Sequence, residues 1–412
     1  MTGGVERVRE RPASHPQVPA RIALLGVGNV GAAFLQRLQL LQQDGLAREL
    51  TLAYVTNSKV ATLLRPSPFG RGVGERVRRS GTSESPLVSV SRRTEPPPAE
   101  ERRYPPPAPV LCAPFGHLLR QAKEGWTVTP SDLDSIARAL TATGDVGPRI
   151  VIDATASEAV AARHAEWLAQ GIHVVTACKL GQGTALQRWC EIKAACEYGR
   201  TRYGDSATVG AGLPLLRTLR ALRAGGDRIH AIAGVLSGSL AWLFNHYDGL
   251  RPFSGFVRDA RAAGYTEPDP RDDLSGEDVR RKLIILARTA GLDLEADAVA
   301  VQSLVPSALA GLPVEHVDGA LPMLDGPLRA QFAEAWKRGE RLRFVARLEA
   351  GRAQVGLESL PADDPLAGGS GTDNRVAIWS DRYRNQPLVI QGPGAGAEVT
   401  AAALLDDVLA LT

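Results

Sequence analysis

Short apolar runs alternate with longer amphipathic segments along the first half of the chain. The short runs have the length and composition of buried strands and cover residues 21–25, 49–55, 149–154 and 172–177. The amphipathic segments predict helices over residues 32–43, 131–140, 158–170 and 184–198. Strands that alternate with helices are typical of a parallel sheet covered on both faces. The pattern therefore predicts a doubly wound α/β domain over residues 20–205.

The second half carries a mixed pattern. Alternating or buried apolar runs predict strands over residues 229–235, 343–349, 353–358, 375–380 and 387–391. Helices are expected after Pro214 as far as Gly225, after Ser237, from Ser275 or Gly276 to Ala290, and over residues 399–411. Residues 206–345 are therefore expected to form a second, α+β domain. Residues 346–412 are expected to return to the first domain.

Two segments lack any such periodicity. Residues 1–19 are polar and contain proline and arginine, and residues 65–110 are rich in proline, serine and arginine. Such compositions bury too little apolar area to offset the entropy of ordering the chain. Both segments are predicted to be disordered, the second as an insert in the first domain.

Composition and charge argue against a nucleic-acid-binding or membrane-spanning protein. The chain has 412 residues, of which 44% are hydrophobic and 23% charged, with a formal net charge of +3. These values are ordinary for a globular protein and do not predict binding to nucleic acid. No apolar run approaches the roughly 18 residues of a membrane-spanning helix. The cysteines (Cys112, Cys178, Cys190 and Cys196) show no metal-binding spacing and suit a reducing compartment, so a cytoplasmic location is expected.

A glycine motif follows the first predicted strand directly. It reads G-V-G-N-V-G and comprises Gly26, Gly28, Asn29, Val30 and Gly31. The first glycine permits a tight turn, the second lets a pyrophosphate approach the backbone, and the third lets the helix pack on the strand. Strand, glycines and helix in this order predict a Rossmann-type dinucleotide site, against the alternative of a structural glycine turn.

The end of the second predicted strand bears on the choice of cofactor. An NAD site usually places an acidic residue there to bind the ribose 2′-hydroxyl. This chain has Asn57, Ser58 and Lys59 instead, and Ser58 with Lys59 suits a 2′-phosphate. NADP is therefore favoured; NAD stays open, because Lys59 can equally begin the next helix.

An acidic stretch at residues 264–283 carries the strongest chemical signal. Its carboxylates are Glu267, Asp269, Asp272, Asp273, Glu277 and Asp278. Pro268 and Pro270 are expected to keep the first part out of a helix. In the helix that follows, Asp278 and Lys282 are four residues apart and share a face.

Two plain alternatives compete for this stretch. An Asp–Lys pair at this spacing is often a solvated surface pair that contributes only about 0.3–0.5 kcal/mol. A calcium loop would need a glycine at its sixth position. Counting from Asp269, that position holds Leu274, so a calcium loop is not expected.

A second lysine lies at the end of a predicted strand. Lys179 follows the strand at residues 172–177. Ligands bind at the carboxyl ends of the strands in open α/β sheets, so Lys179 is a stronger candidate than a lysine on a helix surface.

The acidic stretch, G-Y-T-E-P-D-P-R-D-D-L-S-G-E-D-V-R-R-K, resembles the signature of the homoserine dehydrogenase family. Further matches to that family are the glycine motif, A-T-V-G-A-G-L-P at 207–214, S-G-S-L at 237–240, G-T-D-N at 371–374, and V-I-Q-G-P-G-A-G-A-E-V-T-A-A at 389–402. The likeness is closest to the branch found in plants and in bifunctional aspartokinase–homoserine dehydrogenases. No kinase or regulatory segment is recognised in these residues.

The resemblance implies an activity and roles for particular residues. Members of the family interconvert L-homoserine and L-aspartate 4-semialdehyde with NAD(P), a step toward threonine and methionine. By position, Lys282 resembles the lysine that transfers the proton, and Glu267, Asp273 and Asp278 lie among the carboxylates on the substrate side. Lys179 and Thr155 resemble residues near the nicotinamide and the substrate. The family likeness also implies a homodimer, formed through residues 206–345.

Two positions depart from the family pattern. The family has a glutamate that helps to hold a monovalent cation where this chain has Ser206. Only the backbone carbonyls of Val209, Ala211 and Leu213 then remain as ligands, so the cation site is left open. The family's asparagine before the strand-end lysine is Cys178 here.

These departures and the long insert support a different hypothesis, a catalytically silent NADP-binding relative that acts as a sensor or partner. Another aldehyde or hydroxyacid dehydrogenase is a further alternative. Retention of Glu267, Asp278, Lys282 and Lys179 together favours the enzyme.

Overall fold

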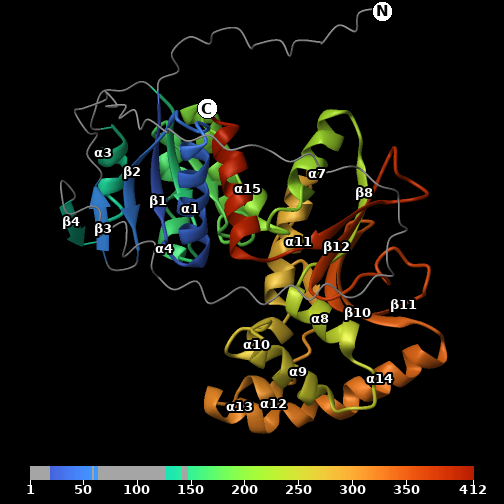
Figure 1. Cartoon of the computed structure of the whole chain (residues 1–412). Helices are drawn as coiled ribbons and strands as arrows, with labels where there is room; N and C mark the ends of the chain where they lie inside the picture. The colour runs from blue at the N-terminus through green and yellow to red at the C-terminus, as the bar shows by residue number, and fades with distance from the viewer. Residues whose placement is uncertain (1–18, 58–59, 64–126, 131, 142–146) are drawn as a thin grey trace, which may run out of the picture.

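The structure is a computed structural model that describes residues 19–57, 60–63, 127–130, 132–141 and 147–412. Almost all of the predicted tail and the whole of the predicted insert at 65–110 lie outside these residues. The described chain forms two lobes, each built around its own sheet (Figure 1).

The first lobe contains a seven-stranded sheet in the order β4-β3-β2-β1-β5-β6-β7. Its parallel strands are β1 (Ala20–Leu25), β2 (Leu50–Thr56), β5 (Arg149–Asp153), β6 (His173–Thr176) and β7 (Tyr203–Gly204). The strands β3 (Val60–Leu63) and β4 (Thr127–Pro130) extend one edge in antiparallel fashion. These last two strands were not predicted, since they lie beside the segment of low complexity.

Helices cover both faces of this sheet, which confirms the predicted doubly wound fold. On one face, α1 (Asn29–Gln43) and α15 (Ala397–Leu409) run side by side and bury Phe34 and Leu404 (Figure 1). On the other face lie α3 (Ser135–Thr141), α5 (His164–Ala169) and α6 (Leu186–Gly199), with Trp167 in their core.

The helix predicted over residues 158–170 is in fact two short ones, α4 (Glu158–Ala161) and α5. The Arg163 N–H bonds the Val160 carbonyl three residues back, and this tighter turn ends the first helix.

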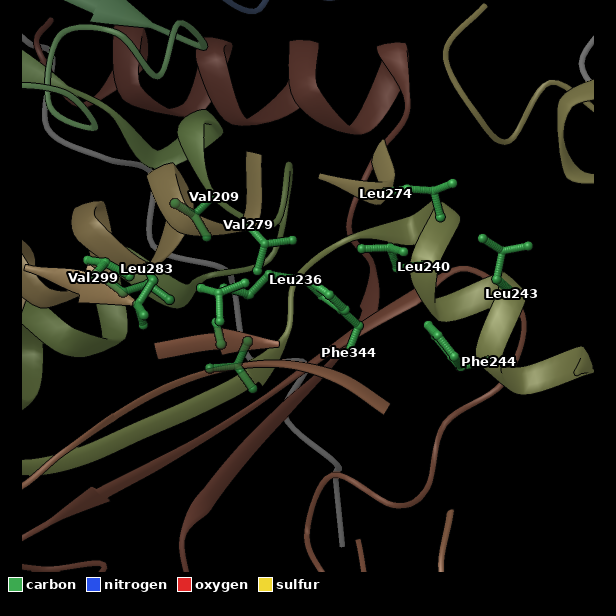
Figure 2. Packing of buried hydrophobic residues seen from close by; sticks show 14 of the residues in the cluster. Val209, Leu236, Leu240, Leu243, Phe244, Leu274, Val279, Leu283, Val299 and Phe344 are labelled. Atoms are coloured by element: carbon green, nitrogen blue, oxygen red, sulfur yellow. The ribbon is translucent and has the colours of Figure 1, made fainter. Parts of the chain in front are cut away.

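The second lobe contains a six-stranded sheet in the order β13-β12-β8-β10-β11-β9. Its strands are β8 (Ile229–Val235), β9 (Val299–Val301), β10 (Arg341–Glu349), β11 (Arg352–Leu360), β12 (Asp373–Ser380) and β13 (Leu388–Pro393). The helices α7 (Leu215–Ala224), α8 (Gly238–His246) and α11 (Glu277–Thr289) pack against it. Figure 2 shows Val279 and Leu283 of α11 in one cluster with Leu236 and Phe344.

A helical layer lies beyond α8 (Figure 1). It contains α9 (Phe253–Ala262), α10 (Pro270–Leu274), α12 (Ser307–Ala310), α13 (Val314–Ala320) and α14 (Asp325–Lys337), with the 3-10 turn η2 (Leu321–Leu324).

The expected return of residues 346–412 to the first domain is wrong for the strands. Both β10 and β12 pair with β8, with Ala346 and Val376 on either side of Gly234, so the C-terminal strands complete the second sheet. Only α15 crosses to the first lobe. The apolar pattern predicts that a segment is a strand, but it does not specify which strand it pairs with.

The expectation that prolines keep the acidic stretch out of a helix is also wrong in part. Pro270 opens the short helix α10, and the Asp269 carboxylate caps it by accepting the Arg271 N–H. A proline is compatible with the first turn of a helix because the N–H at that position has no helical partner.

Candidate active site

The glycine turn has the geometry that a dinucleotide requires. Gly26 has a φ of 88°, which favours glycine. A Cβ added at Gly31 would lie 1.9 Å from the Gly26 carbonyl oxygen, so α1 packs on the turn itself. A Cβ at Gly28 would meet no described atom within 4 Å, which leaves the backbone open to a ligand.

The start of α1 is suited to an anion. Gly28 is its N-cap, no side-chain hydrogen bond caps it within the described chain, and its first turn has no acidic residue. Unused N–H groups and the helix dipole favour a phosphate at such a helix end. Asn29 is exposed there, while Val30 packs partly on the core. The described residues therefore fit a dinucleotide cofactor.

The end of β2 lies beside this turn, because the Gly26 N–H bonds the Thr56 carbonyl at 2.9 Å. Asn57 follows and is partly buried. Ser58 and Lys59, the residues predicted to bind a 2′-phosphate, lie outside the described residues.

The structure brings Lys179 and Lys282 onto one carboxylate. Lys282 Nζ lies 2.7 Å from Asp278 Oδ2, and Lys179 Nζ lies 3.5 Å from Asp278 Oδ1. Lys179 follows β6 in the first lobe, whereas the other two residues lie on α11 in the second. The candidate site is therefore at the boundary between the lobes.

Lys282 is held more tightly than a surface lysine. Its side chain is only 11% exposed, and its ammonium group also donates to the Leu236 carbonyl at 2.7 Å. An ammonium group has three N–H donors, so one has no partner among the described residues. The solvated surface pair considered from the sequence does not describe this geometry.

The two lysines keep Asp278 ionised. Partial burial alone would raise the pKa of Asp278, but the charges of Lys282 and Lys179 outweigh it and hold this pKa well below its ordinary value.

The other predicted carboxylates lie on the loop before α11. Asp273 accepts hydrogen bonds from Ser239 Oγ at 2.6 Å and from the Glu267 N–H at 2.8 Å. Burial raises the pKa of Asp273, aided by the charge of Asp278, although these hydrogen bonds oppose the rise. The Glu267 side chain is exposed. Asp273 thus orients the loop that presents Glu267.

Hydrogen bonds between the lobes form a clamp that joins the loop after Lys179 to α11. Arg288 near the end of α11 donates to the Gln182 carbonyl, and Gln182 Nε2 donates to Thr289 Oγ1 at 3.2 Å. Gln182 lies three residues after Lys179, so this loop and α11 are held together close to the site.

Thr155 lies between the glycine turn and β5. A Cβ added at Gly26 would lie 2.8 Å from Thr155 Cγ2. The Thr155 hydroxyl donates to Asp153 Oδ1 at 2.6 Å, and the Thr155 N–H donates to the same oxygen at 2.9 Å. This hydroxyl is therefore fixed beside the turn that fits the cofactor.

The Cys178 thiol is buried behind Lys179. Burial, with Asp153 nearby, raises its pKa to about 12, so it is a neutral thiol at ordinary pH. Its backbone N–H donates to Thr176 Oγ1 at 2.8 Å.

Some of the groups considered as ligands for a monovalent cation already have hydrogen-bond partners. Ser206 donates through its hydroxyl to Asp407 Oδ1 at 2.7 Å and through its N–H to Oδ2 at 2.9 Å. Val209 and Ala211 are buried, and the Leu213 carbonyl accepts the Leu215 N–H at 2.8 Å. Across the described ranges, no three His, Cys, Asp or Glu side chains are grouped to hold a metal ion.

Several groups at the site were not among the candidates taken from the sequence. Asn374 is fully buried, and its Nδ2 lies 3.4 Å from the same Leu236 carbonyl that Lys282 contacts. Ser239 and Asn374 belong to the motifs S-G-S-L and G-T-D-N, which could have drawn attention to them. The Leu236 carbonyl, as a backbone group, could not have been found this way.

None of the helices in the described part of the chain combines the length and the apolar composition needed to cross a lipid bilayer.

Comparison with known proteins matches this arrangement to one family across both lobes. A family model described as "Homoserine dehydrogenase, NAD binding domain" matches residues 26–202, and one described as "Homoserine dehydrogenase" matches residues 214–409.

Individual relatives agree with this match. A homoserine dehydrogenase from Emericella nidulans is 36% identical over 405 residues, which are 95% of this chain and 98% of that protein. The bifunctional aspartokinase/homoserine dehydrogenase 1 of Zea mays is 43% identical over 308 residues, 74% of this chain but only 34% of that protein. This chain thus spans about a third of the length of the bifunctional relative. A solved structure from Candida auris, of unknown function, has a TM-score of 0.75 and 30% identity, with 95% of this chain and 98% of that chain covered.

Proposed function

Because this chain belongs to the homoserine dehydrogenase family, we propose that it interconverts L-homoserine and L-aspartate 4-semialdehyde with a nicotinamide cofactor. The observation that carries this proposal is the contact of Asp278 with both Lys282 and Lys179 where the two lobes meet.

Lys282 is the proposed proton donor and acceptor. Two of its donors are committed to Asp278 and the Leu236 carbonyl, so the ammonium is held in one orientation with its remaining N–H for the substrate oxygen. In the reductive direction the Lys282 ammonium donates a proton to this oxygen and becomes a neutral amine, and in the oxidative direction this neutral amine accepts the hydroxyl proton. When bound, the cofactor supplies or accepts the hydride at the substrate carbon. Lys179 shares Asp278 and adds positive charge at the same place, which favours the developing oxyanion.

Two carboxylates are proposed to bind the amino-acid part of the substrate. The substrate ammonium requires a counter-charge, and Glu267 is exposed on a loop that Asp273 orients. Asp273 lies close enough to Asp278 for their charges to interact, so a cation bound here would lower the repulsion between them.

A direct assay tests this function. Purified protein with NADPH and L-aspartate 4-semialdehyde should consume NADPH and form L-homoserine in equal amounts, measured by absorbance at about 340 nm and by chromatography of the product. NADPH binding without turnover would favour the alternative, a silent relative that acts as a sensor or partner. Turnover with other aldehydes but not with this one would instead indicate a different dehydrogenase.

NADP is the proposed cofactor, with NAD as the alternative. The support is the lack of an acidic residue among Asn57, Ser58 and Lys59 at the end of β2. Lys59→Ala should weaken NADPH binding about ten- to a hundredfold and leave NADH binding nearly unchanged, because a charged contact of this kind contributes about 1.5–3 kcal/mol. Fluorescence titration with each cofactor measures both constants. Equal losses for NADPH and NADH would contradict the assignment to the 2′-phosphate.

The remaining expectations stay proposals. We propose a homodimer, on the family likeness, and a cytoplasmic location, on the cysteine usage. We also propose that residues 20–205 with α15 form the nucleotide domain and that the lobe around the six-stranded sheet is the substrate domain. The mechanism needs no monovalent cation, and none of its steps uses the carbonyls of Val209, Ala211 or Leu213.

A further inference from the structure

A chain of polar side chains lies beneath the carboxyl ends of β5 and β6. Tyr203 OH lies 3.0 Å from His164 Nδ1, and His164 Nε2 lies 3.0 Å from Asp153 Oδ2. Asp153 and His164 have no exposed surface. None of these three residues has a role in the mechanism above.

The direction of the hydrogen bonds follows from the chemistry of the three groups. An ionised carboxylate can only accept, so His164 Nε2–H donates to Asp153. With the ring proton on Nε2, Nδ1 accepts from the Tyr203 hydroxyl. Burial, together with nearby acidic groups, raises the pKa of Tyr203 well above its ordinary value, so this hydroxyl keeps the proton that it donates.

Asp153 connects this chain to both strand ends at the candidate site. Its Oδ1 accepts the Thr155 hydroxyl at 2.6 Å, and its Oδ2 lies 3.3 Å from Thr176 Oγ1. Thr176 Oγ1 in turn accepts the N–H of Cys178, the residue before Lys179, at 2.8 Å. One carboxylate thus orients Thr155, two residues after the end of β5, and the start of the loop that carries Lys179 after β6.

The hydrogen bond that Thr155 donates to Asp153 also decides whether the Thr155 hydroxyl can donate to a ligand or accept from it. Because the proton is committed to Asp153, the oxygen can only accept from a ligand. One lone pair takes the Ser157 N–H at 3.1 Å, and the other has no partner among the described residues. This oxygen therefore suits an N–H donor such as the carboxamide of a nicotinamide ring.

A purely structural role does not readily explain why the buried carboxylate of Asp153 is placed here. Burying a carboxylate costs several kcal/mol unless its charge is compensated, and apolar side chains of similar volume are often as stable. Within the described chain, no lysine or arginine forms an ion pair with Asp153, and the nearest basic nitrogen given for it there is His164 Nε2 at 3.0 Å.

We propose that Tyr203, His164 and Asp153 form a positioning relay, which holds Thr155 as a hydrogen-bond acceptor for the nicotinamide cofactor and fixes the backbone N–H of Cys178, the residue before Lys179. The proposal rests on the proposed function only for the presence of that cofactor. Its test therefore measures cofactor binding, which does not depend on the identity of the substrate.

His164→Leu removes both hydrogen bonds of the imidazole, while His164→Gln can keep them, since its amide N–H₂ can donate to Asp153 and its oxygen can accept from Tyr203. We expect His164→Leu to raise the Kd of NADPH about five- to tenfold, the loss expected when one ordinary hydrogen bond is no longer oriented. His164→Gln should stay within about threefold of the wild type. Fluorescence titration measures Kd, and a thermal scan measures Tm for each variant.

Trp167→Phe is the matched control. Trp167 lies on the same helix and is fully buried, and its Nε1 has no hydrogen-bond partner among the described residues. This variant should lower Tm without changing Kd. An unchanged Kd in His164→Leu, with a lowered Tm, would show that the relay is only structural and would overturn the proposal.

If His164→Leu does not fold, a second variant tests the proposal. Asp153→Asn keeps the shape of the side chain but removes its charge and reverses one hydrogen bond, and it should raise Kd by a similar factor. An unchanged Kd here would equally overturn the proposal. A protein that binds NADPH with these shifts but does not reduce aspartate semialdehyde would contradict the proposed function and leave the relay standing.

Discussion

Lys282→Ala should lower kcat by about 10²–10⁴-fold in both directions, the loss typical for removal of a general acid or base. The affinity for NADPH should stay nearly constant, because Lys282 lies on α11 in the second lobe and the glycine turn lies in the first. Steady-state kinetics in each direction, with a separate fluorescence titration of NADPH, measures both quantities.

The control for this variant is Lys337→Ala. Lys337 is a helix lysine that also pairs with a carboxylate, Glu334 at 2.7 Å, but its side chain is 69% exposed, so its loss should leave kcat unchanged. Adding a small amine to Lys282→Ala should restore part of the rate, because the amine can occupy the space of the lost ammonium. If Lys282→Ala kept more than about a tenth of the wild-type kcat, its loss would be smaller than the roughly hundredfold minimum expected for such a residue. Lys179 or water would then have to supply the proton.

Phe344→Ala should lower the free energy of unfolding by about 3–5 kcal/mol, the usual cost of deleting a buried phenylalanine side chain. Phe344 is 1% exposed and lies on β10 within the core of the second lobe (Figure 2). A Cβ added at Gly276 would lie 2.8 Å from Phe344 Cζ, so this ring supports the turn from which α11 begins. The cavity left by the alanine would loosen the helix that carries Asp278 and Lys282.

Denaturant unfolding, followed by circular dichroism, measures this loss. Tyr198→Ala is the control, since it removes an aromatic ring that is 83% exposed, and its effect should be small. Because loosening acts on α11 and not on the glycine turn, Phe344→Ala should also lower kcat more than it weakens NADPH binding. A stability equal to that of the wild type would mean that the core of the second lobe closes around the missing ring.

Agreement between sequence and structure is best where one local segment decides the geometry. The glycine turn could be predicted because a positive φ at Gly26 and a close approach at Gly31 are requirements that few other residues meet. The contact between Asp278 and Lys282 could be predicted because residues four apart on a helix are neighbours wherever that helix lies.

The break at Arg163 and the helix that begins at Pro270 show the limit of such local patterns. Periodicity predicts that a segment is helical, but a single hydrogen bond to the third residue back, or a capping aspartate, decides where the helix ends or begins. Small errors in boundary are therefore expected, and these two left the site residues unaffected.

By itself the sequence determined the class of the first domain, the turn that fits a dinucleotide, and the helical face shared by Asp278 and Lys282, because each depends on neighbours along the chain. Only the tertiary structure decided that Lys179 shares Asp278, that the Leu236 carbonyl holds Lys282, and that β12 and β13 complete the second sheet. These contacts join segments far apart in the sequence, as in the clamp between Gln182 and Thr289, which are 107 residues apart. Local periodicity contains no information on which distant segments meet, and burial in a common core decides it.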